Sequence, residues 1–186
     1  MKRFLSCIMC IFLFSGCGVS SGELDIAVSL RQRLNQSKGF SFECQITADY
    51  ADALYEFTLS CSCDPLGEMR FQVISPETIC GISGQVDQRG GELTFDDQLL
   101  AFPLLADGYL SPVSAPWLML KALRGGYIAS AGTDSSGYFV TINDTYAEET
   151  MQVDIWLDKE QNPYYCQILW QGRRLLSIAV SNFIYL

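Results

Sequence analysis

The sequence contains no histidine among its 186 residues, and this absence excludes several kinds of chemistry. A Ser-His-Asp or Cys-His catalytic relay needs an imidazole as its base, and many zinc sites use imidazole ligands. Neither arrangement exists in this chain. The functional classes that remain are binding proteins and enzymes that work without imidazole.

Basic side chains are also scarce. The chain has 12 Lys and Arg against 21 Asp and Glu, which gives a formal net charge of −9 at pH 7. Residues 1–16 hold two of the basic residues and none of the acidic ones, so the rest of the chain carries a net charge of −11. Such a negative field repels phosphate backbones and anionic headgroups. It argues against nucleic acid as a partner and against electrostatic docking on a membrane.

The apolar run near the start of the chain, residues 4–14, is too short to cross a membrane, because a spanning helix needs roughly twenty apolar residues. Lys2 and Arg3 precede the run, and the small residues Ser15 and Gly16 follow it. This order is typical of a secretory signal peptide. The sequence therefore predicts that residues 1–16 are removed on export.

Cys17 follows the small residues directly, and the segment Phe14-Ser15-Gly16-Cys17 resembles the bacterial lipobox. Phe14 stands where leucine is usual, although Leu13 is next to it. The resemblance implies that the Cys17 thiol is diacylated and that Cys17 becomes the new N-terminus. Acyl chains such as palmitate then anchor the protein to the extracytoplasmic face of the cell membrane. The alternative is an ordinary secreted protein with a cysteine near its cleavage site.

Removal of the leader leaves 170 residues, a size that suits one domain with its own core. Residues 17–22 are mostly small and are predicted to be a tether. Residues 23–186 are predicted to be a single domain.

Beyond Cys17 the chain holds five cysteines, so at least one thiol is left without an intramolecular partner. They are Cys44, Cys61, Cys63, Cys80 and Cys166. Cys61 and Cys63 are two apart in a predicted strand, where they share a face but lie too far apart for an easy disulfide. A Cys-x-Cys metal pair is one interpretation; small buried hydrophobic residues are the other. No metal or cofactor is predicted.

The spacing of apolar residues predicts one helix within residues 20–39 and another within residues 114–126. Elsewhere the period is two, which predicts strands. A loop is expected at residues 103–114. The strands are expected at residues 40–50, 55–63, 69–73, 79–86, 92–95, 99–102, 127–131, 138–142, 151–157, 164–170 and 175–180.

This order contains no strand-helix-strand crossovers, so a parallel sheet is disfavoured. The predicted fold class is mainly β (α+β): a strongly curved antiparallel sheet that forms an incomplete β-barrel, with helices packed on its concave side. Such a structure either fills its interior with side chains or leaves an apolar pocket.

Five segments carry a resemblance to a known family. They are the N-terminal helix, the Phe-rich hairpin at 40–63, the segments at 69–77 and 90–95, and the helix at 116–125. Together they resemble the LolA/LolB lipoprotein-carrier superfamily, to whose fold a clostridial germination lipoprotein also belongs. The resemblance implies a half-open β-barrel with a helical lid, whose apolar interior binds acyl chains in the carriers. Residues 75–78 are polar, whereas the membrane-anchored carriers expose an apolar residue on this loop.

The residues that match the cavity wall of the carriers lie on the inward sides of the strands and on the lid. Plain core packing is the alternative for each of them. They are Phe57, Leu59, Phe71, Val73, Leu93 and Phe95 on the strands, and Trp117 and Leu120 on the lid.

Three kinds of function stay open. The first is a lipid-anchored binding protein that holds an acyl chain or another hydrophobic ligand between sheet and lid. The alternative is a non-catalytic lipoprotein that binds and regulates an envelope or spore-cortex enzyme, with exposed aromatic residues around Tyr109, Tyr146 or Tyr164-Tyr165. An enzyme is not predicted, because the adjacent pairs Asp96-Asp97 and Glu148-Glu149 face opposite ways on a strand.

The lipobox-like segment makes the first testable prediction. Mass spectrometry of the protein from its native membrane is expected to find an N-terminal Cys17 that carries a diacylglyceryl group. An unmodified chain that still carries residues 1–16 would contradict both the processing and the anchor.

Overall fold

The computed structural model describes residues 21–186 apart from residue 97, residues 107–108 and residues 145–150. Cys17 and the predicted leader lie outside the described residues. Among the residues that are described, no helix has the length and apolar character that a membrane crossing requires.

The described residues form two α-helices, two short 3-10 helices and thirteen strands. The helices are α2 (Ser21–Gln36), η2 (Glu77–Ile79), η3 (Pro112–Ser114) and α3 (Ala115–Gly125). The strands are β1 (Phe40–Asp49), β2 (Leu54–Cys63), β3 (Met69–Ser75), β4 (Ser83–Asp87), β5 (Gly90–Phe95), β6 (Gln98–Phe102), β7 (Leu105–Ala106), β8 (Tyr109–Leu110), β9 (Tyr127–Asp134), β10 (Gly137–Asn143), β11 (Met151–Leu157), β12 (Pro163–Trp170) and β13 (Arg173–Tyr185).

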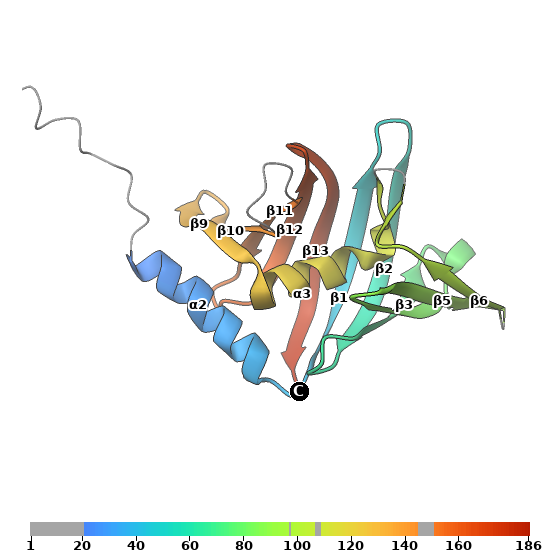
Figure 1. Cartoon of the computed structure of the whole chain (residues 1–186), viewed down its shortest axis with the longest axis horizontal. Coiled ribbons are helices and arrows are strands. Elements are labelled where there is room, and N and C mark those ends of the chain that lie inside the picture. The colour runs from blue at the N-terminus through green and yellow to red at the C-terminus, as the bar shows by residue number, and fades with distance from the viewer. Residues whose placement is uncertain (1–20, 97, 107–108, 145–150) are drawn as a thin grey trace, which may run out of the picture.

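Eleven strands form one antiparallel sheet in the order β6-β5-β4-β3-β2-β1-β13-β12-β11-β10-β9. Strands β1–β6 are one meander and β9–β13 are a second. The two meanders join where β1 pairs with β13 in the middle of the sheet. The sheet curves but does not close, because β6 and β9 are its two separate edges (Figure 1). The predicted incomplete barrel of antiparallel strands is confirmed.

The two-residue rhythm of the sequence decides which side of the sheet is buried. In β1, β2, β3 and β11, buried residues alternate with more exposed ones. Successive side chains of a strand point to opposite faces, so this alternation places one apolar face on the inside of the curve. The side chains of Ile46, Leu59, Ile155 and Leu176 are completely buried there.

Helix α3 crosses the concave side of the sheet, and α2 lies near β9 at one end (Figure 1). Eight residues of α3 are buried, so it is apolar around most of its circumference, as a helix enclosed by protein must be. Arg31 of α2 ties the two helices together. Its guanidinium donates hydrogen bonds of 2.7 Å to the backbone carbonyls of Leu123 and Gly126, at the C-terminal end of α3.

The structure corrects the predicted elements at three places. The strand expected at 79–86 begins only at Ser83, because residues 77–79 form a 3-10 helix. A Gly-Gly pair between two predicted strands usually marks a turn, but Gly90 and Gly91 lie inside β5, and the turn is made by Gln88 and Arg89. The loop expected at 103–114 contains the short pair β7 and β8 and the 3-10 helix η3. Strand pairing extends over the glycines, whereas a 3-10 turn replaces the start of the expected strand at 79–86.

The burial of the inward face makes a prediction about stability. Leu59 and Leu54 lie in the same strand, but Leu59 is fully buried and Leu54 is 65% exposed. Leu59→Ala is expected to lower the free energy of unfolding by about 2–5 kcal/mol, because it leaves a cavity in the core. Leu54→Ala, the matched control, is expected to change it by less than about 0.5 kcal/mol. Urea unfolding followed by circular dichroism measures both. Equal effects of the two substitutions would contradict this assignment of the core face.

Candidate functional site

Six of the eight residues that the resemblance placed on a cavity wall lie together in the hydrophobic core. Phe57, Leu59, Phe71 and Val73 come from β2 and β3, and Trp117 and Leu120 come from α3. Each is at most 8% exposed. These six predicted wall residues are therefore part of the buried core.

The other two predicted residues lie beyond the reach of the lid. Leu93 is half-buried at the margin of the core, and Phe95 is 52% exposed. Both belong to β5, in the part of the sheet formed by β4, β5 and β6, which we call the wing. The wing extends past the end of α3 to the right of Figure 1. Leu93 and Phe95 lie on the same face of the sheet as the buried residues of β3. They are more exposed because β5 lies nearer the edge of the sheet.

Beside α3 the structure has a pocket of about 390 Å³. Its wall consists of the C-terminal half of α3, the turn between β2 and β3, Gln88 of the wing and Asp144 after β10. Trp117, Leu120 and Leu66 supply apolar surface. Leu66 itself is 92% exposed and covers no core. The pocket thus opens along the flank of the lid.

Two hydrogen bonds hold α3 against the β2–β3 turn at this pocket. The indole Nε1 of Trp117 donates to the carbonyl of Gly67 at 2.9 Å. The guanidinium of Arg124 donates to the carbonyl of Pro65 at 2.6 Å and to Oδ1 of Asn35 at 3.2 Å. A turn built from Pro65 and Gly67 has exposed carbonyls that accept such bonds. These contacts fix the width of the pocket mouth.

The mouth of the pocket carries positive charge. The ammonium of Lys121 lies 5.3 Å from the centroid of the Trp117 ring, within range of a cation–π interaction. Arg124 and Lys121 both line the pocket, and Asp144 is the acidic residue among the lining residues. The chain as a whole is strongly negative, so a pocket that combines two basic side chains with apolar residues differs in charge from most of the surface.

Sequence reasoning missed Leu66, Lys121 and Arg124. A signal for the two basic residues was present: Trp117, Lys121 and Arg124 follow one another at spacings of four and three, which places them on one stripe of a helix. No signal in the sequence shows that the β2–β3 turn lies opposite that stripe.

The buried cysteines behave as small apolar residues. Cys44, Cys61, Cys63 and Cys166 are buried and free, and Cys80 is free and exposed. The sulfur atoms of Cys44 and Cys61 lie 3.9 Å apart, and this contact together with burial raises the pKa of Cys61 well above its usual value. Within the described part of the chain, no three potential metal-ligating side chains lie close enough to hold an ion.

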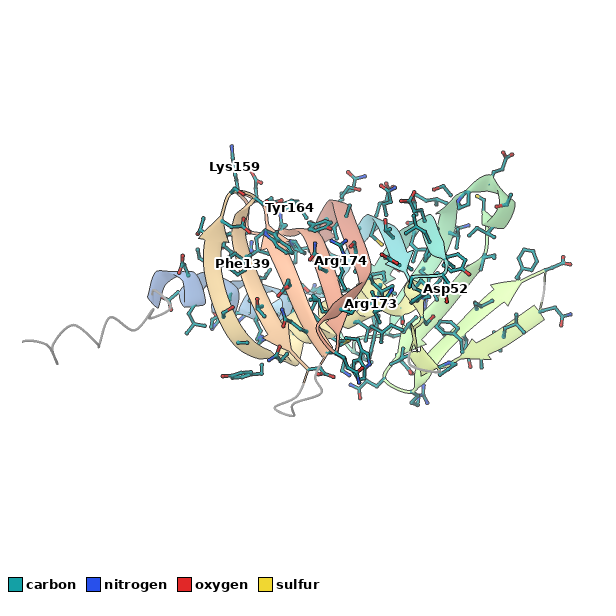
Figure 2. The ribbon with its side chains drawn as sticks, turned by 90° about the horizontal axis from the view of Figure 1, so that it is seen from above. Asp52, Phe139, Lys159, Tyr164, Arg173 and Arg174 are labelled. Atoms are coloured by element: carbon teal, nitrogen blue, oxygen red, sulfur yellow. The ribbon has the colours of Figure 1, made fainter. Side chains whose placement is uncertain are left out.

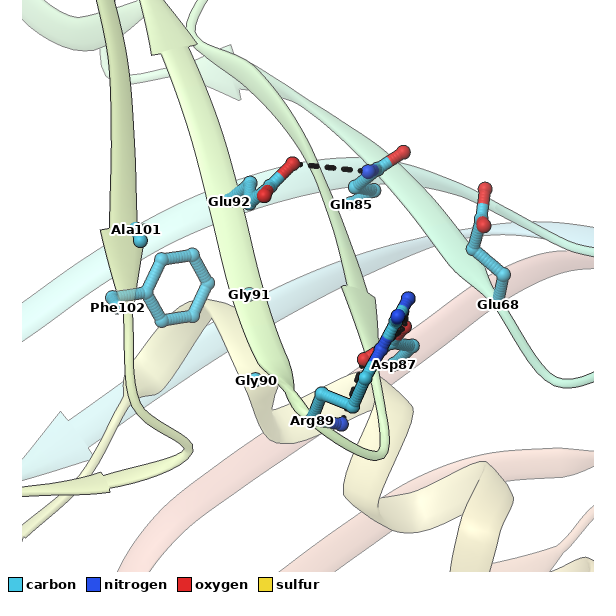
Figure 3. A pocket seen from close by; sticks show the side chains of 9 residues that line it. All are labelled: Glu68, Gln85, Asp87, Arg89, Gly90, Gly91, Glu92, Ala101 and Phe102. Carbon is cyan, nitrogen blue, oxygen red and sulfur yellow. Dashed lines mark hydrogen bonds and ion pairs between the residues drawn. The ribbon is translucent and has the colours of Figure 1, made fainter.

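A second pocket, of about 350 Å³, lies on the wing and has a different chemistry (Figure 3). Glu68, Asp87 and Glu92 give it three carboxylates, and Arg89 is its basic residue. Arg89 pairs with Asp87 at 2.6 Å, and this hydrogen-bonded pair lowers the pKa of the Asp87 carboxyl. Ala101 and Phe102 of the edge strand β6 complete the wall.

The aromatic residues that the sequence offered as a protein-binding patch are only partly described. Tyr146 lies outside the described residues, and the side chain of Tyr109 is not described. Tyr164 and Tyr165 are half-buried. The hydroxyl of Tyr164, which is labelled in Figure 2, donates to the carbonyl of Ser136 at 2.7 Å.

No protein-family model matches the sequence, and a search of the curated proteins found no match. Solved structures that are similar include a LolA superfamily protein from Nitrosomonas europaea, with 11% identity, 84% of this chain and 92% of that chain covered, and a TM-score of 0.44. A putative outer membrane lipoprotein-sorting protein domain from Vibrio parahaemolyticus has 10% identity, coverages of 88% and 92%, and a TM-score of 0.47. Lipoprotein LppX from Mycobacterium tuberculosis has 10% identity, coverages of 87% and 93%, and a TM-score of 0.42.

The LolA superfamily and a lipoprotein-sorting domain are thus among the similar structures, at 10–11% identity and TM-scores of 0.44–0.47.

The thiol of Cys63 provides a chemical test of the pocket wall. Burial raises its pKa to about 11, so at pH 8 only about one thiol in a thousand is the reactive thiolate. Iodoacetamide at pH 8 is expected to label the exposed Cys80 and to leave Cys63 unlabelled. Labelling of Cys63 should rise as the pH approaches 11. Peptide mapping by mass spectrometry measures both sites, and equal labelling at pH 8 would contradict a buried Cys63.

Proposed function

We propose that this chain is a non-catalytic binding protein, anchored by a lipid on Cys17 to the extracytoplasmic face of the cell membrane. It holds a hydrophobic ligand that carries one negative charge, such as a fatty acid, along the flank of the lid α3. The observation that carries the proposal is the combination, in one pocket, of the apolar residues Trp117, Leu120 and Leu66 with the cations Lys121 and Arg124.

The size and composition of the pocket suit such a ligand. Its volume of about 390 Å³ lies in the usual range of small-molecule sites. An acyl chain that covers Leu66, which is 92% exposed, removes apolar surface from water, which contributes about 25 cal/mol for each Å². A carboxylate near Lys121 and Arg124 gains ion pairs that a neutral ligand lacks.

The interior between sheet and lid is filled by the buried residues Phe57, Leu59, Phe71 and Val73. We therefore place the ligand at the flank of α3, with Trp117 and Leu120 as the predicted wall residues that it contacts. Deeper entry of an acyl chain between sheet and lid requires α3 to move away from the β2–β3 turn. That movement breaks the bond from Trp117 to Gly67.

Two carboxyl groups outside this pocket have lowered pKa values. Hydrogen bonds lower the pKa of Asp87, mainly from Arg89, and that of Asp134, mainly from Trp156. A general acid needs a raised pKa, so these two groups are unsuited to proton donation near neutral pH.

The test uses competition for a fluorescent fatty-acid probe by palmitic acid and by the alcohol of the same chain length. Lys121→Gln is expected to weaken binding of the acid about two- to fivefold and to leave the alcohol unchanged, because an exposed ion pair is lost. Leu66→Ala is expected to weaken both ligands about three- to tenfold, because it removes apolar contact.

The matched control is Lys159→Gln, since Lys159 is an exposed lysine in the turn between β11 and β12 (Figure 2). No uptake of the probe would contradict the proposal. Equal effects of Lys121→Gln and Lys159→Gln would contradict the placement of the carboxylate.

A further inference from the structure

The wing exposes apolar side chains on both faces of its outermost strands. Phe95 is 52% exposed, Leu99 64% and Leu100 56%. Residues 95 and 100 lie on the concave side, since Leu93 pairs with Leu100 and Phe95 pairs with Gln98. Leu99 lies on the opposite face, together with Ala101. Phe95 and Leu100 are diagonal neighbours on one face, and exposed apolar residues that lie together are typical of interaction sites.

The edge strand β6 has no charged residue, no proline and, among the residues that the structure describes, no helix packed over it. It pairs with β5 on one side and ends the sheet on the other. Its residues, Gln98 to Phe102, include no charged residue and no proline. Natural proteins usually protect such edges with lysine, proline, a bulge or a covering helix. The opposite edge, β9, has α2 packed against it, whereas α2 and α3 both lie away from β6 in Figure 1.

Beside this edge lies the acidic pocket of the wing. Ala101 pairs with Glu92, and Glu92 pairs with Gln85, so the three side chains form a row across β6, β5 and β4 (Figure 3). Glu92 accepts a hydrogen bond of 3.1 Å from Nε2 of Gln85. It makes no ion pair with any described residue, whereas Asp87 pairs with Arg89 and Glu68 with Arg70. Because Ala101 is small, Glu92 is open towards the edge.

We propose that β6 is a docking edge for an extended peptide segment of another protein, which adds to the sheet as a further antiparallel or parallel strand and alternates apolar with basic residues. The backbone of β6 supplies the hydrogen bonds of strand addition. The apolar residues of the peptide lie beside Leu100 on the concave face. Its basic residues lie on the other face, over Leu99 and Ala101, and their charged ends reach Glu92.

The geometry of a sheet supports this reach. An added strand lies about 4.8 Å from β6 and about 9–10 Å from β5, a span that an extended lysine and a glutamate cover together. The pleat fixes which peptide residues face Glu92, because every second residue points to that face.

Charge favours a basic peptide over a second copy of this chain. Residues 83–102 contain four acidic side chains and one basic side chain. Two wings placed edge to edge would bring like charges together, which lowers affinity, whereas a basic peptide would be attracted.

This docking edge gives a specific location to the alternative function, which is binding to an envelope protein. It does not depend on the fatty-acid pocket at α3, because no residue lines both pockets.

The experiment measures fluorescence anisotropy of a labelled synthetic peptide of alternating valine and lysine with the full chain, at low and at high salt. The alternating peptide is expected to bind more tightly than a peptide of the same composition with its valines and lysines in two blocks. Hydrogen exchange of the protein is expected to slow at residues 99–102 when the alternating peptide is bound.

Two variants test the two halves of the site. Glu92→Gln is expected to weaken binding about two- to fivefold at low salt and to reduce its salt dependence. Leu100→Lys is expected to weaken it more than about tenfold, because it places a charge on the edge where the valines lie. The matched controls are Glu56→Gln and Leu54→Lys, both at exposed positions of β2, and they are expected to leave binding unchanged.

Equal affinity for the two peptides would overturn the proposal, as would equal effects of the variants and their controls. Sedimentation velocity of the full chain measures its oligomeric state and is an independent test. A dimer of the full chain that Leu100→Lys dissociates would assign the edge to a second copy and would also overturn the proposal.

Discussion

The burial of α3 against the concave face of the sheet is the interaction on which the rest of this structure depends. The sheet has two halves that are joined by the pairing of β1 with β13, and each half contributes apolar side chains to the same core. A helix that is apolar around most of its circumference fills that space and holds the two halves at their curvature. Without it, both faces would be exposed to water, at a cost that grows with the apolar area.

The position of α3 also divides the functional surfaces. Where the helix covers β1–β3, the inward residues are core. Along its flank, Lys121 and Arg124 emerge at the edge of the same apolar layer, and a pocket forms with the β2–β3 turn. Beyond its end, the outer strands of the wing keep the alternation of a buried sheet, but Phe95 and Leu100 are exposed. One helix of eleven residues therefore produces a core, a charged apolar pocket and an uncovered edge.

Glycines allow the wing to keep its shape without a covering helix. A Cβ atom at Gly91 would lie 2.1 Å from the ring of Phe102, and one at Gly84 would lie 2.2 Å from the carbonyl oxygen of Glu92. The aromatic ring of Phe102 packs directly on the backbone of β5 at Gly91. The wing thus replaces part of the missing lid with its own side chain, which leaves Phe95 and Leu100 uncovered.

The sequence by itself determined the fold class, the two helices, nearly all of the strands and the inward face of β1, β2 and β3. It could do so because period and burial are local consequences of strand and helix geometry. Six of the eight residues that it offered as a cavity wall are buried in the core. The tertiary structure was needed to show that Phe95 is exposed, that Leu66 and Lys121 line one pocket, and that Glu92 lies open beside β6. These facts depend on where α3 ends relative to the strands and on which turn lies opposite its basic stripe, and such distances between segments far apart in the chain are set by packing.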